Sequence, residues 1–189
     1  MKGVILAGGY GTRLFPLTKC INKHLLPIFD KPMIYYSLST LMIAGIREIC
    51  IICNPKDVEK FSNLLGDGSK LGIEIIYKAQ EKASGIPHGL LIAKDFVKNS
   101  NVTLILGDNI LYGSGLSDLV DCSNYLGNGA QIYSYKVKNP NDYGVIVENN
   151  DGSIDRLVEK PKDNISDKAV IGLYHFDNNV FEICESLQP

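Results

Sequence analysis

The sequence predicts an α/β protein built on a doubly wound, Rossmann-like mixed sheet that is predominantly parallel with antiparallel additions. In the first half of the chain, short β-branched runs alternate with segments of helical periodicity, a pattern typical of parallel strands covered by helices on both faces. In the second half, four strand-like runs are separated only by turn sequences. The chain therefore combines a parallel α/β half with a half in which strands follow one another directly.

Four strands are expected in the first half, because apolar runs of strand length end there at polar or glycine residues. They are GVILA (3–7), EICIICN (48–54), IEIIYKA (73–79) and VTLILGD (102–108). Helices are expected at 33–44, 54–65 and 87–98. The second helix starts with Asn54 as N-cap and Pro55 in the first turn, where the missing proline N–H removes no helical hydrogen bond.

Four further strands are expected in the second half. They are AQIYSYKV (130–137), GVIVEN (144–149), SIDRLVE (153–159) and AVIGLYHF (169–176). Turn residues separate them, as in Asn139-Pro140 and in Asn150-Asp151-Gly152. The chain shows no internal repeat and no linker, so a single domain over residues 1–189 is expected.

Composition and charge exclude several classes of protein. A chain of 189 residues with 45% hydrophobic residues has enough apolar side chains for a substantial core, and a net charge of −2 gives no reason to expect a nucleic-acid partner. The charge is uneven, since residues 1–29 carry four basic and no acidic side chains. Positive charge therefore collects around the glycine-rich start of the chain.

Compartment is predicted from apolar runs and from cysteine usage. No apolar run reaches the roughly 20 residues of a membrane span, and 4–7 is too short for a signal-peptide core. Cys50 and Cys53 lie in a predicted strand, where an offset of three places them on opposite faces, so reduced core cysteines are favoured over a zinc or redox pair. A cytoplasmic protein without a membrane partner is expected.

The first strand runs into a loop that contains Gly8, Gly9 and Gly11 and then Arg13. Such a loop at the carboxyl edge of an α/β sheet exposes backbone N–H groups that favour anions. It lacks the third glycine of a dinucleotide fingerprint and the Gly-Lys-[Ser/Thr] of a Walker loop, so spacing alone leaves two alternatives, an anion site and a tight turn. Lys19 and Lys23 follow, and with Arg13 they suit a polyphosphate.

Several stretches resemble the bacterial sugar-1-phosphate nucleotidyltransferases, nearest to the glucose-1-phosphate thymidylyltransferases. They are LAGGYGTRLFPLT, NKHLLPIFDKPMIYYSLSTLMIAGIREI, LLGDGS, LILGDNILYG, YGVIV, LVEKPK and AVIGLY. The resemblance implies the nucleotide-diphospho-sugar transferase fold. It also implies transfer of a nucleotidyl group from dTTP or UTP to a sugar 1-phosphate, with glucose 1-phosphate expected, and release of pyrophosphate. This reaction belongs to nucleotide-sugar and cell-surface polysaccharide biosynthesis.

Roles for individual residues follow from the same resemblance. It implies Arg13, Lys23 and Asp108 as catalytic residues, with Mg²⁺ as the cofactor bound by Asp108. The nucleotide-binding residues are implied to be Leu6, Gly8, Gly9, Gly11, Thr12, Arg13, Gln80 and Gly85. The sugar-phosphate site is implied to comprise Gly144, Glu159, Lys160, Val170 and Tyr174. From the residues alone, Asp108 at a strand tip also fits a turn, Gln80 an ordinary loop and Glu159-Lys160 a solvated turn, while Pro161 favours an extended Lys160.

Two departures from the family pattern leave alternatives open. Gly85-Ile86-Pro87-His88-Gly89 replaces the common Gly-Leu-Ala-Gln-Ala, which changes the wall beside the base and the sugar. The chain stops at 188–189, where family members continue with a second metal-binding aspartate, so a C-terminally truncated domain is expected. Two alternatives to nucleotidyl transfer remain. One is a nucleotide or nucleotide-sugar binding module with weak or lost catalysis, and the other is a Rossmann-type dehydrogenase, against which the absent third glycine argues. The family resemblance also implies a homo-oligomer.

Overall fold

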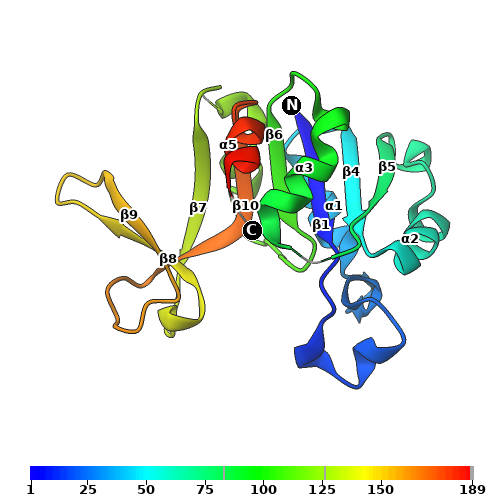
Figure 1. Ribbon diagram of the computed structural model, residues 1–189, viewed down its shortest axis with the longest axis horizontal. Helices are drawn as coiled ribbons and strands as arrows, with labels where there is room; N and C mark the ends of the chain where they lie inside the picture. Colours follow the sequence, from blue (N-terminus) through cyan, green and yellow to red (C-terminus); the bar gives the residue numbers. More distant parts are fainter. Residues whose placement is uncertain (83, 126, 188–189) are drawn as a thin grey trace.

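The computed structural model describes residues 1–82, 84–125 and 127–187, so the expectation for 188–189 lies outside the described residues. Its main sheet has eight strands in the order β5-β4-β1-β6-β10-β8-β9, with β7 also paired to β10 (Figure 1). All eight predicted strands are confirmed. They are β1 (Lys2–Ala7), β4 (Glu48–Cys53), β5 (Glu74–Ala79), β6 (Val102–Leu106), β7 (Ala130–Lys136), β8 (Gly144–Glu148), β9 (Ile154–Glu159) and β10 (Lys168–Phe176).

The helices agree with the prediction in position and add two that the sequence did not indicate. The expected helices are α1 (Ile34–Ile43), α2 (Val58–Leu65) and α3 (Gly85–Val97). Two short additional helices are α4 (Leu116–Val120) and α5 (Val180–Ser186), and a two-stranded ribbon joins β2 (Pro27–Ile28) to β3 (Lys31–Pro32). Among the described residues, no helix combines the length and apolar character needed to span a bilayer.

Strand pairing changes from parallel to antiparallel after β6. Strands β5, β4, β1 and β6 are mutually parallel, whereas β10 is antiparallel to β6, β7 and β8, and β9 is antiparallel to β8. The antiparallel part contains as many strands as the parallel part, so the sheet is mixed as predicted but not predominantly parallel. Strand β10 joins the two parts, because its last residues pair with β6 and Ala169 near its start pairs with β8. The β8–β9 hairpin consequently extends away from the helix-covered body (Figure 1).

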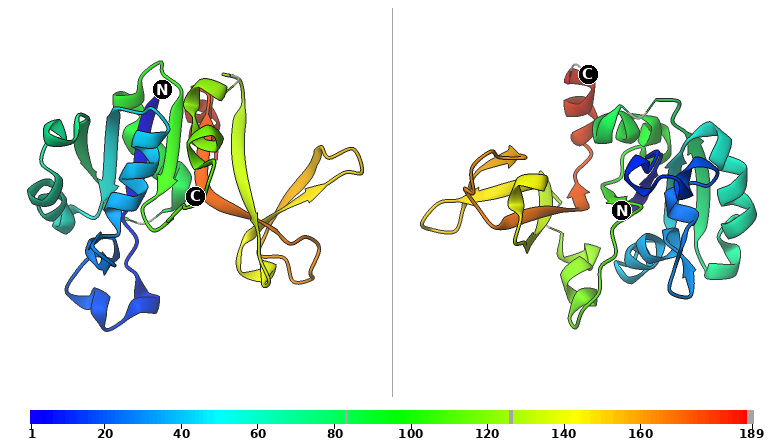
Figure 2. Two further views of the ribbon diagram at one scale, coloured as in Figure 1. Left: turned by 180° about the vertical axis from the view of Figure 1, so that it is seen from behind. Right: turned by 90° about the horizontal axis from the view of Figure 1, so that it is seen from below.

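Helices cover both faces of the parallel part, as expected for a doubly wound sheet. Helices α3 and α5 lie on the face toward the viewer in Figure 1, and α1 lies on the opposite face, seen in the left view of Figure 2. Strand alternation supplies the two cores. Val4 packs in the α3–α5 cluster, and Ile5 packs in the cluster that includes α1.

Cys50 and Cys53, the two cysteines of the C-x-x-C sequence, lie on opposite faces of the sheet, as the strand periodicity predicts. Cys50 is buried in the α3–α5 cluster and Cys53 in the opposite cluster. Burial raises the pKa of each thiol to about 12. All five cysteines are free, and the described part of the chain contains no group of three or more side chains of the His, Cys, Asp or Glu type placed to hold a metal.

One local prediction was correct only in part, and another was wrong. Asn54 and Pro55 occupy the N-cap and first-turn positions of a short 3-10 turn (Pro55–Asp57) that precedes α2, rather than of α2 itself, and the Asn54 side chain accepts no capping hydrogen bond but donates to Asp57 Oδ2. Lys160 is not extended but has φ of +43°. Its N–H donates to Tyr143 O at 3.0 Å, so the connection to the neighbouring strand overrides the preference set by Pro161.

Helix α3 approaches β1 closely at Gly89, and this contact carries a stability prediction. A Cβ on Gly89 would lie 2.7 Å from Leu6 Cδ2. We expect Gly89→Ala to lower the free energy of unfolding by about 1 kcal/mol, since the overlap outweighs the better helix propensity of alanine. In a Leu6→Ala background the overlap disappears, so the same change should become stabilising. Urea denaturation of the four proteins measures both effects, and destabilisation in both backgrounds would contradict the explanation.

Candidate active site

The glycine loop leaves the carboxyl end of β1 and folds back over the segment that carries Lys23. Gly11 has φ of +61°, and a Cβ there would lie 3.0 Å from Thr18 Cγ2 and 3.1 Å from Lys23 Cβ. The Thr18 hydroxyl donates to Gly11 O at 2.7 Å and fixes this turn. Gly11 is therefore required both for backbone conformation and for close approach.

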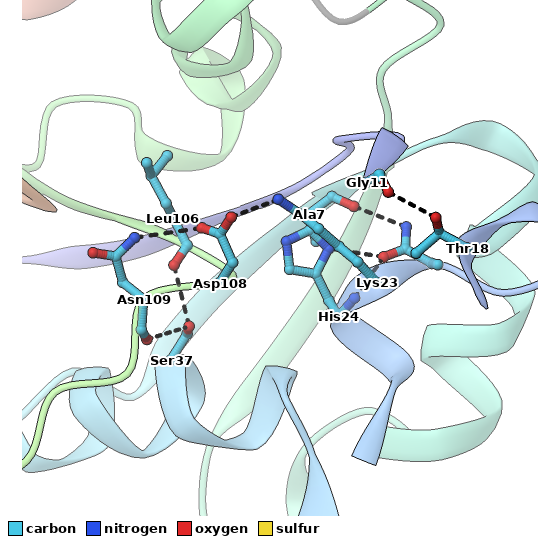
Figure 3. A network of polar contacts seen from close by, with 10 residues as sticks. Ala7, Gly11, Thr18, Lys23, His24, Ser37, Leu106, Asp108 and Asn109 are labelled. Atoms are coloured by element: carbon cyan, nitrogen blue, oxygen red, sulfur yellow. Dashed lines mark hydrogen bonds and ion pairs between the residues drawn. The ribbon is translucent and has the colours of Figure 1, made fainter. Parts of the chain in front are cut away.

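Lys23 reaches across the loop to Asp108, as Figure 3 shows. Lys23 Nζ lies 2.5 Å from Asp108 Oδ2, and a Cβ on Gly9 would lie 3.5 Å from the same Nζ. Asp108 directly follows Gly107 at the end of β6, and β6 is the parallel neighbour of β1, so both strands end at one edge of the sheet. The sequence predicted each residue, and the topology brings them together.

Asp108 has one oxygen that is strongly engaged and one that is not. Partial burial opposes its ionisation, but the hydrogen bond and charge of Lys23 hold the pKa of the carboxyl below its usual range. Asp108 Oδ1 has only Asn109 Nδ2 at 3.4 Å as a partner among the described residues. The side chain is 39% exposed. An ionised, accessible carboxylate oxygen is therefore available to a cation.

A buried polar cluster, formed by Asn22, His24 and Asp57, fixes the backbone on both sides of Lys23. The Asn22 amide donates to Ala7 O and to Asp57 Oδ2, each at 3.0 Å. Its oxygen accepts from the His24 N–H at 2.9 Å and from His24 Nδ1 at 2.8 Å. The cluster thus ties the Lys23 segment to the end of β1 and to the start of α2.

Charge in this cluster is set by burial and hydrogen bonding. Burial opposes ionisation of Asp57, but hydrogen bonds from Asn22 and Lys60 hold its pKa below the usual range. Burial, aided by the charge of Lys23, lowers the pKa of His24 to about 4, so the ring is neutral. The sequence analysis missed Asn22 and Asp57, because no local pattern shows that residues 35 positions apart meet.

Gln80 follows β5 and lies against the first glycine of the loop. It is 6% exposed, and a Cβ on Gly8 would lie 3.1 Å from Gln80 Oε1. Gln80 Nε2 donates to His88 Nδ1 at 3.0 Å. His88 was noted in the sequence only as a departure from the family pattern, and the structure adds it to the candidate site. Gly85 begins α3 with φ of +87°, and the contact between this helix and Gln80 is made by His88.

Three further residues predicted to bind the nucleotide, Leu6, Thr12 and Arg13, take no part in the contacts of Gln80 and Lys23 described above. Leu6 packs against Gly89 on α3, and its carbonyl lies beside Gly107. Thr12 and Arg13 lie on an exposed 3-10 turn (Thr12–Leu14) beyond Gly11. Within the described part of the chain, the Arg13 side chain makes no hydrogen bond or ion pair, and Asp108 is paired with Lys23 instead.

The predicted sugar-phosphate residues fall into two groups. Val170 and Tyr174 line a cleft of about 1060 Å³ that also contains Asp108 and runs along β10 and β7. Burial and the charge of Glu159 raise the pKa of Tyr174. In contrast, Gly144 pairs with Glu159 in the β8–β9 hairpin. The side chains of Glu159 and Lys160 are exposed there, and Lys160 Nζ lies 3.8 Å from Glu159 Oε1. Among the described residues, neither Glu159 nor Lys160 lines the cleft.

Two buried histidines predict how stability depends on pH. Burial lowers the pKa of both His24 and His175 from 6.5 to about 4. Between those values the unfolded chain binds protons that the folded chain does not. The contribution of the two histidines to the free energy of unfolding is therefore fully present above pH 6.5 and is lost as the pH decreases toward 4. His175→Gln removes one of these titratable groups. It should reduce the slope of the free energy of unfolding against pH by up to about 1.4 kcal/mol per pH unit. Urea denaturation from pH 7 to pH 5 measures the slope, and an unchanged slope would contradict the assignment.

The chain was compared with known proteins. A family model described as Nucleotidyl transferase matches residues 2–189. Glucose-1-phosphate thymidylyltransferase of Neisseria meningitidis serogroup A is 47% identical over 189 residues, which are 100% of this chain and 66% of that protein. The chain thus spans slightly less than two thirds of the length of this relative.

Solved structures give the same result for the fold. A Bacillus anthracis structure, described as a glucose-1-phosphate thymidylyltransferase in complex with a sucrose, has a TM-score of 0.92 at 39% identity and covers 100% of this chain and 76% of its own. The structure of a UDP-glucose pyrophosphorylase complexed with UDP-glucose has a TM-score of 0.79 at 28% identity. The match covers 100% of this chain and 80% of the chain in that structure. The predicted fold class is thereby confirmed.

Proposed function

The chain belongs to the nucleotidyl transferase family, and from that premise we propose that it transfers a nucleotidyl group from dTTP or UTP to a sugar 1-phosphate, with glucose 1-phosphate as the expected acceptor. The observation that carries this proposal is the Lys23–Asp108 pair, held at 2.5 Å beneath Gly9 where β1 and β6 end. A fixed cation beside bare loop amides and an ionised carboxylate is the combination that a polyphosphate and its counter-ion require. In this proposal the nucleotidyltransferase domain spans residues 1–189.

In the proposed reaction, a phosphate oxygen of the sugar 1-phosphate attacks the α-phosphorus of the triphosphate. A new P–O bond forms as the bond to the β-phosphate breaks, and pyrophosphate leaves. Two anions must meet, so positioning and charge neutralisation carry the catalysis. Lys23 is proposed to counter the charge that develops on the leaving group, and the loop at Gly8, Gly9 and Gly11 is proposed to donate backbone N–H groups to the phosphates.

Arg13 is proposed to join this site only when a triphosphate is present. Its exposed 3-10 turn follows directly on Gly11, and its guanidinium is not committed to another group in the described chain. A planar guanidinium suits bidentate contact with phosphate oxygens. Thr12 lies on the same turn and is proposed to contact the nucleotide together with Arg13.

The residues at Asp108 fit a divalent cation, for which we propose Mg²⁺. Magnesium in proteins commonly takes one or two carboxylates and completes its coordination with substrate phosphates and water. Asp108 offers one ionised carboxylate whose Oδ1 is weakly engaged, which suits such a site. When bound, Mg²⁺ supplies charge neutralisation at the phosphates.

The two remaining parts of the site are proposed to hold the base and the sugar. Gln80, whose amide oxygen lies beside Gly8, presents a buried amide suited to the donor and acceptor edge of thymine or uracil. Gly85 is proposed to approach the base through its backbone. The cleft lined by Val170 and Tyr174 opens from Asp108 and is proposed for the sugar. Gly144, Glu159 and Lys160 are assigned to the sugar phosphate from the family pattern, and in this structure they lie outside the cleft lining among the described residues.

Pyrophosphate release tests the proposal. The protein is incubated with Mg²⁺, glucose 1-phosphate and either dTTP or UTP, and a coupled assay measures pyrophosphate. Release with one or both triphosphates is expected, and none without the sugar phosphate. If both triphosphates bind, as seen by thermal shift, but no pyrophosphate appears, the chain is a nucleotide-binding module rather than a catalyst. We also propose a cytoplasmic location, in line with its free cysteines, and a homo-oligomer, which size-exclusion chromatography tests.

A further inference from the structure

One hydrogen bond joins the residue proposed to read the base to the helix behind it. Gln80 Nε2 lies 3.0 Å from His88 Nδ1. An amide nitrogen only donates, so in this arrangement His88 Nδ1 accepts and the imidazole carries its proton on Nε2. While the ring keeps this tautomer, a rotation of the Gln80 amide by about 180° would turn its oxygen toward the unprotonated Nδ1 and lose the hydrogen bond.

The rest of Gln80 is held as well. Its backbone N–H donates to Cys53 O at 2.8 Å, which continues the pairing of β5 with β4. Its Oε1 points toward Gly8, where a Cβ would come within 3.1 Å. With the backbone fixed and the nitrogen bound to His88, the amide oxygen stays on the side of the glycine loop.

The position of His88 depends on how α3 packs. His88 lies in the first half of α3, and the next residue, Gly89, contacts Leu6 of β1 so closely that no Cβ fits without movement. The close approach of α3 to β1 brings the imidazole within reach of Gln80. The change from Gln-Ala in the family pattern to His88-Gly89 thus has one structural consequence, a ring nitrogen placed on Gln80.

We propose that His88 is a positioning residue for base selection, which fixes the Gln80 amide so that the site accepts thymine and uracil and rejects cytosine. The inference rests on the proposed function, since it requires that the base lies at Gln80. Thymine and uracil present a ring N–H donor beside carbonyl acceptors, whereas cytosine presents a ring acceptor beside an amino donor. A glutamine free to rotate by about 180° matches either edge. A glutamine fixed by His88 matches one edge only, which is discrimination by a mismatch built into the site.

Equilibrium binding of dTTP and dCTP tests this role. We would measure both dissociation constants by isothermal titration calorimetry with Mg²⁺ for the natural chain and for His88→Phe, which keeps an aromatic ring without the acceptor. The ratio of the dCTP to the dTTP dissociation constant should fall about tenfold in the variant, the factor expected for one hydrogen bond. His88→Gln offers an amide oxygen as acceptor and should restore part of the ratio.

Controls separate positioning from stability. Lys94→Ala on the same helix removes an exposed ion pair with Glu185 and should leave the ratio unchanged. A purely structural loss at His88 would weaken both nucleotides equally and would also leave the ratio unchanged. If His88→Phe does not fold, His88→Ala takes its place with the same expected fall.

The outcomes distinguish this inference from the proposed function. Selective binding by the natural chain with an unchanged ratio in the His88 variants overturns the role of His88 and leaves the proposed function standing. Equal binding of dTTP and dCTP by the natural chain overturns the role of His88 as well. Failure of the natural chain to bind either nucleotide overturns both.

Discussion

Replacement of Lys23 by methionine is expected to lower the rate of nucleotidyl transfer by about 10² to 10³, because it removes a fixed charge aimed at the departing pyrophosphate. Methionine keeps the length of the side chain, so the loop contacts at Gly9 and Gly11 are largely preserved. The Lys23–Asp108 pair is partly exposed, so its loss should change the free energy of unfolding by less than about 1 kcal/mol. A large loss of rate with a small loss of stability is the expected result.

The measurement is pyrophosphate release at saturating dTTP and glucose 1-phosphate, together with urea denaturation of each variant. Lys70→Met is the matched control, since Lys70 lies on an exposed 3-10 turn (Ser69–Leu71) that precedes the start of β5, whereas the glycine loop follows the end of β1. It should retain the full rate. A Lys23→Met protein that retains more than a tenth of the natural rate would remove Lys23 from the proposed mechanism.

The largest effect on stability is expected for Asn22→Ala, which should lower the free energy of unfolding by about 3 to 5 kcal/mol. Asn22 is 7% exposed and takes part in four hydrogen bonds, two as donor and two as acceptor. Alanine leaves Ala7 O and His24 Nδ1 without this partner, and it removes one of the hydrogen bonds that stabilise the ionised Asp57. Buried polar groups that lose their partners account for the size of the effect.

Chemical denaturation measures this loss, with Asn63→Ala as control because Asn63 is exposed on α2. The control should change the free energy of unfolding by less than about 0.5 kcal/mol. Asn22→Ser keeps a short acceptor for the His24 N–H and should fall between the natural chain and Asn22→Ala. Equal stabilities for Asn22→Ala and the control would show that the buried cluster does not hold the loop.

The sequence determined the elements and the chemistry of the loop. Strand and helix periodicities are local, so β1, β4, β5 and β6 could be found from runs of a few residues. The second-half strands were found in the same way, through the turn residues that separate them. The glycines after β1, together with Lys23 and Asp108, were also readable, because each is marked by its position at the end of a strand or within a family motif.

Only the tertiary structure decided which of these residues meet and what holds them. Lys23 and Asp108 are 85 positions apart, and they pair because β1 and β6 are parallel neighbours in register. Local preference failed at Lys160, where a hydrogen bond to Tyr143, directly before β8, outweighs the effect of the following proline. Asn22 and His88 were found only through their partners, because a side-chain hydrogen bond depends on packing between elements and leaves no period in the sequence.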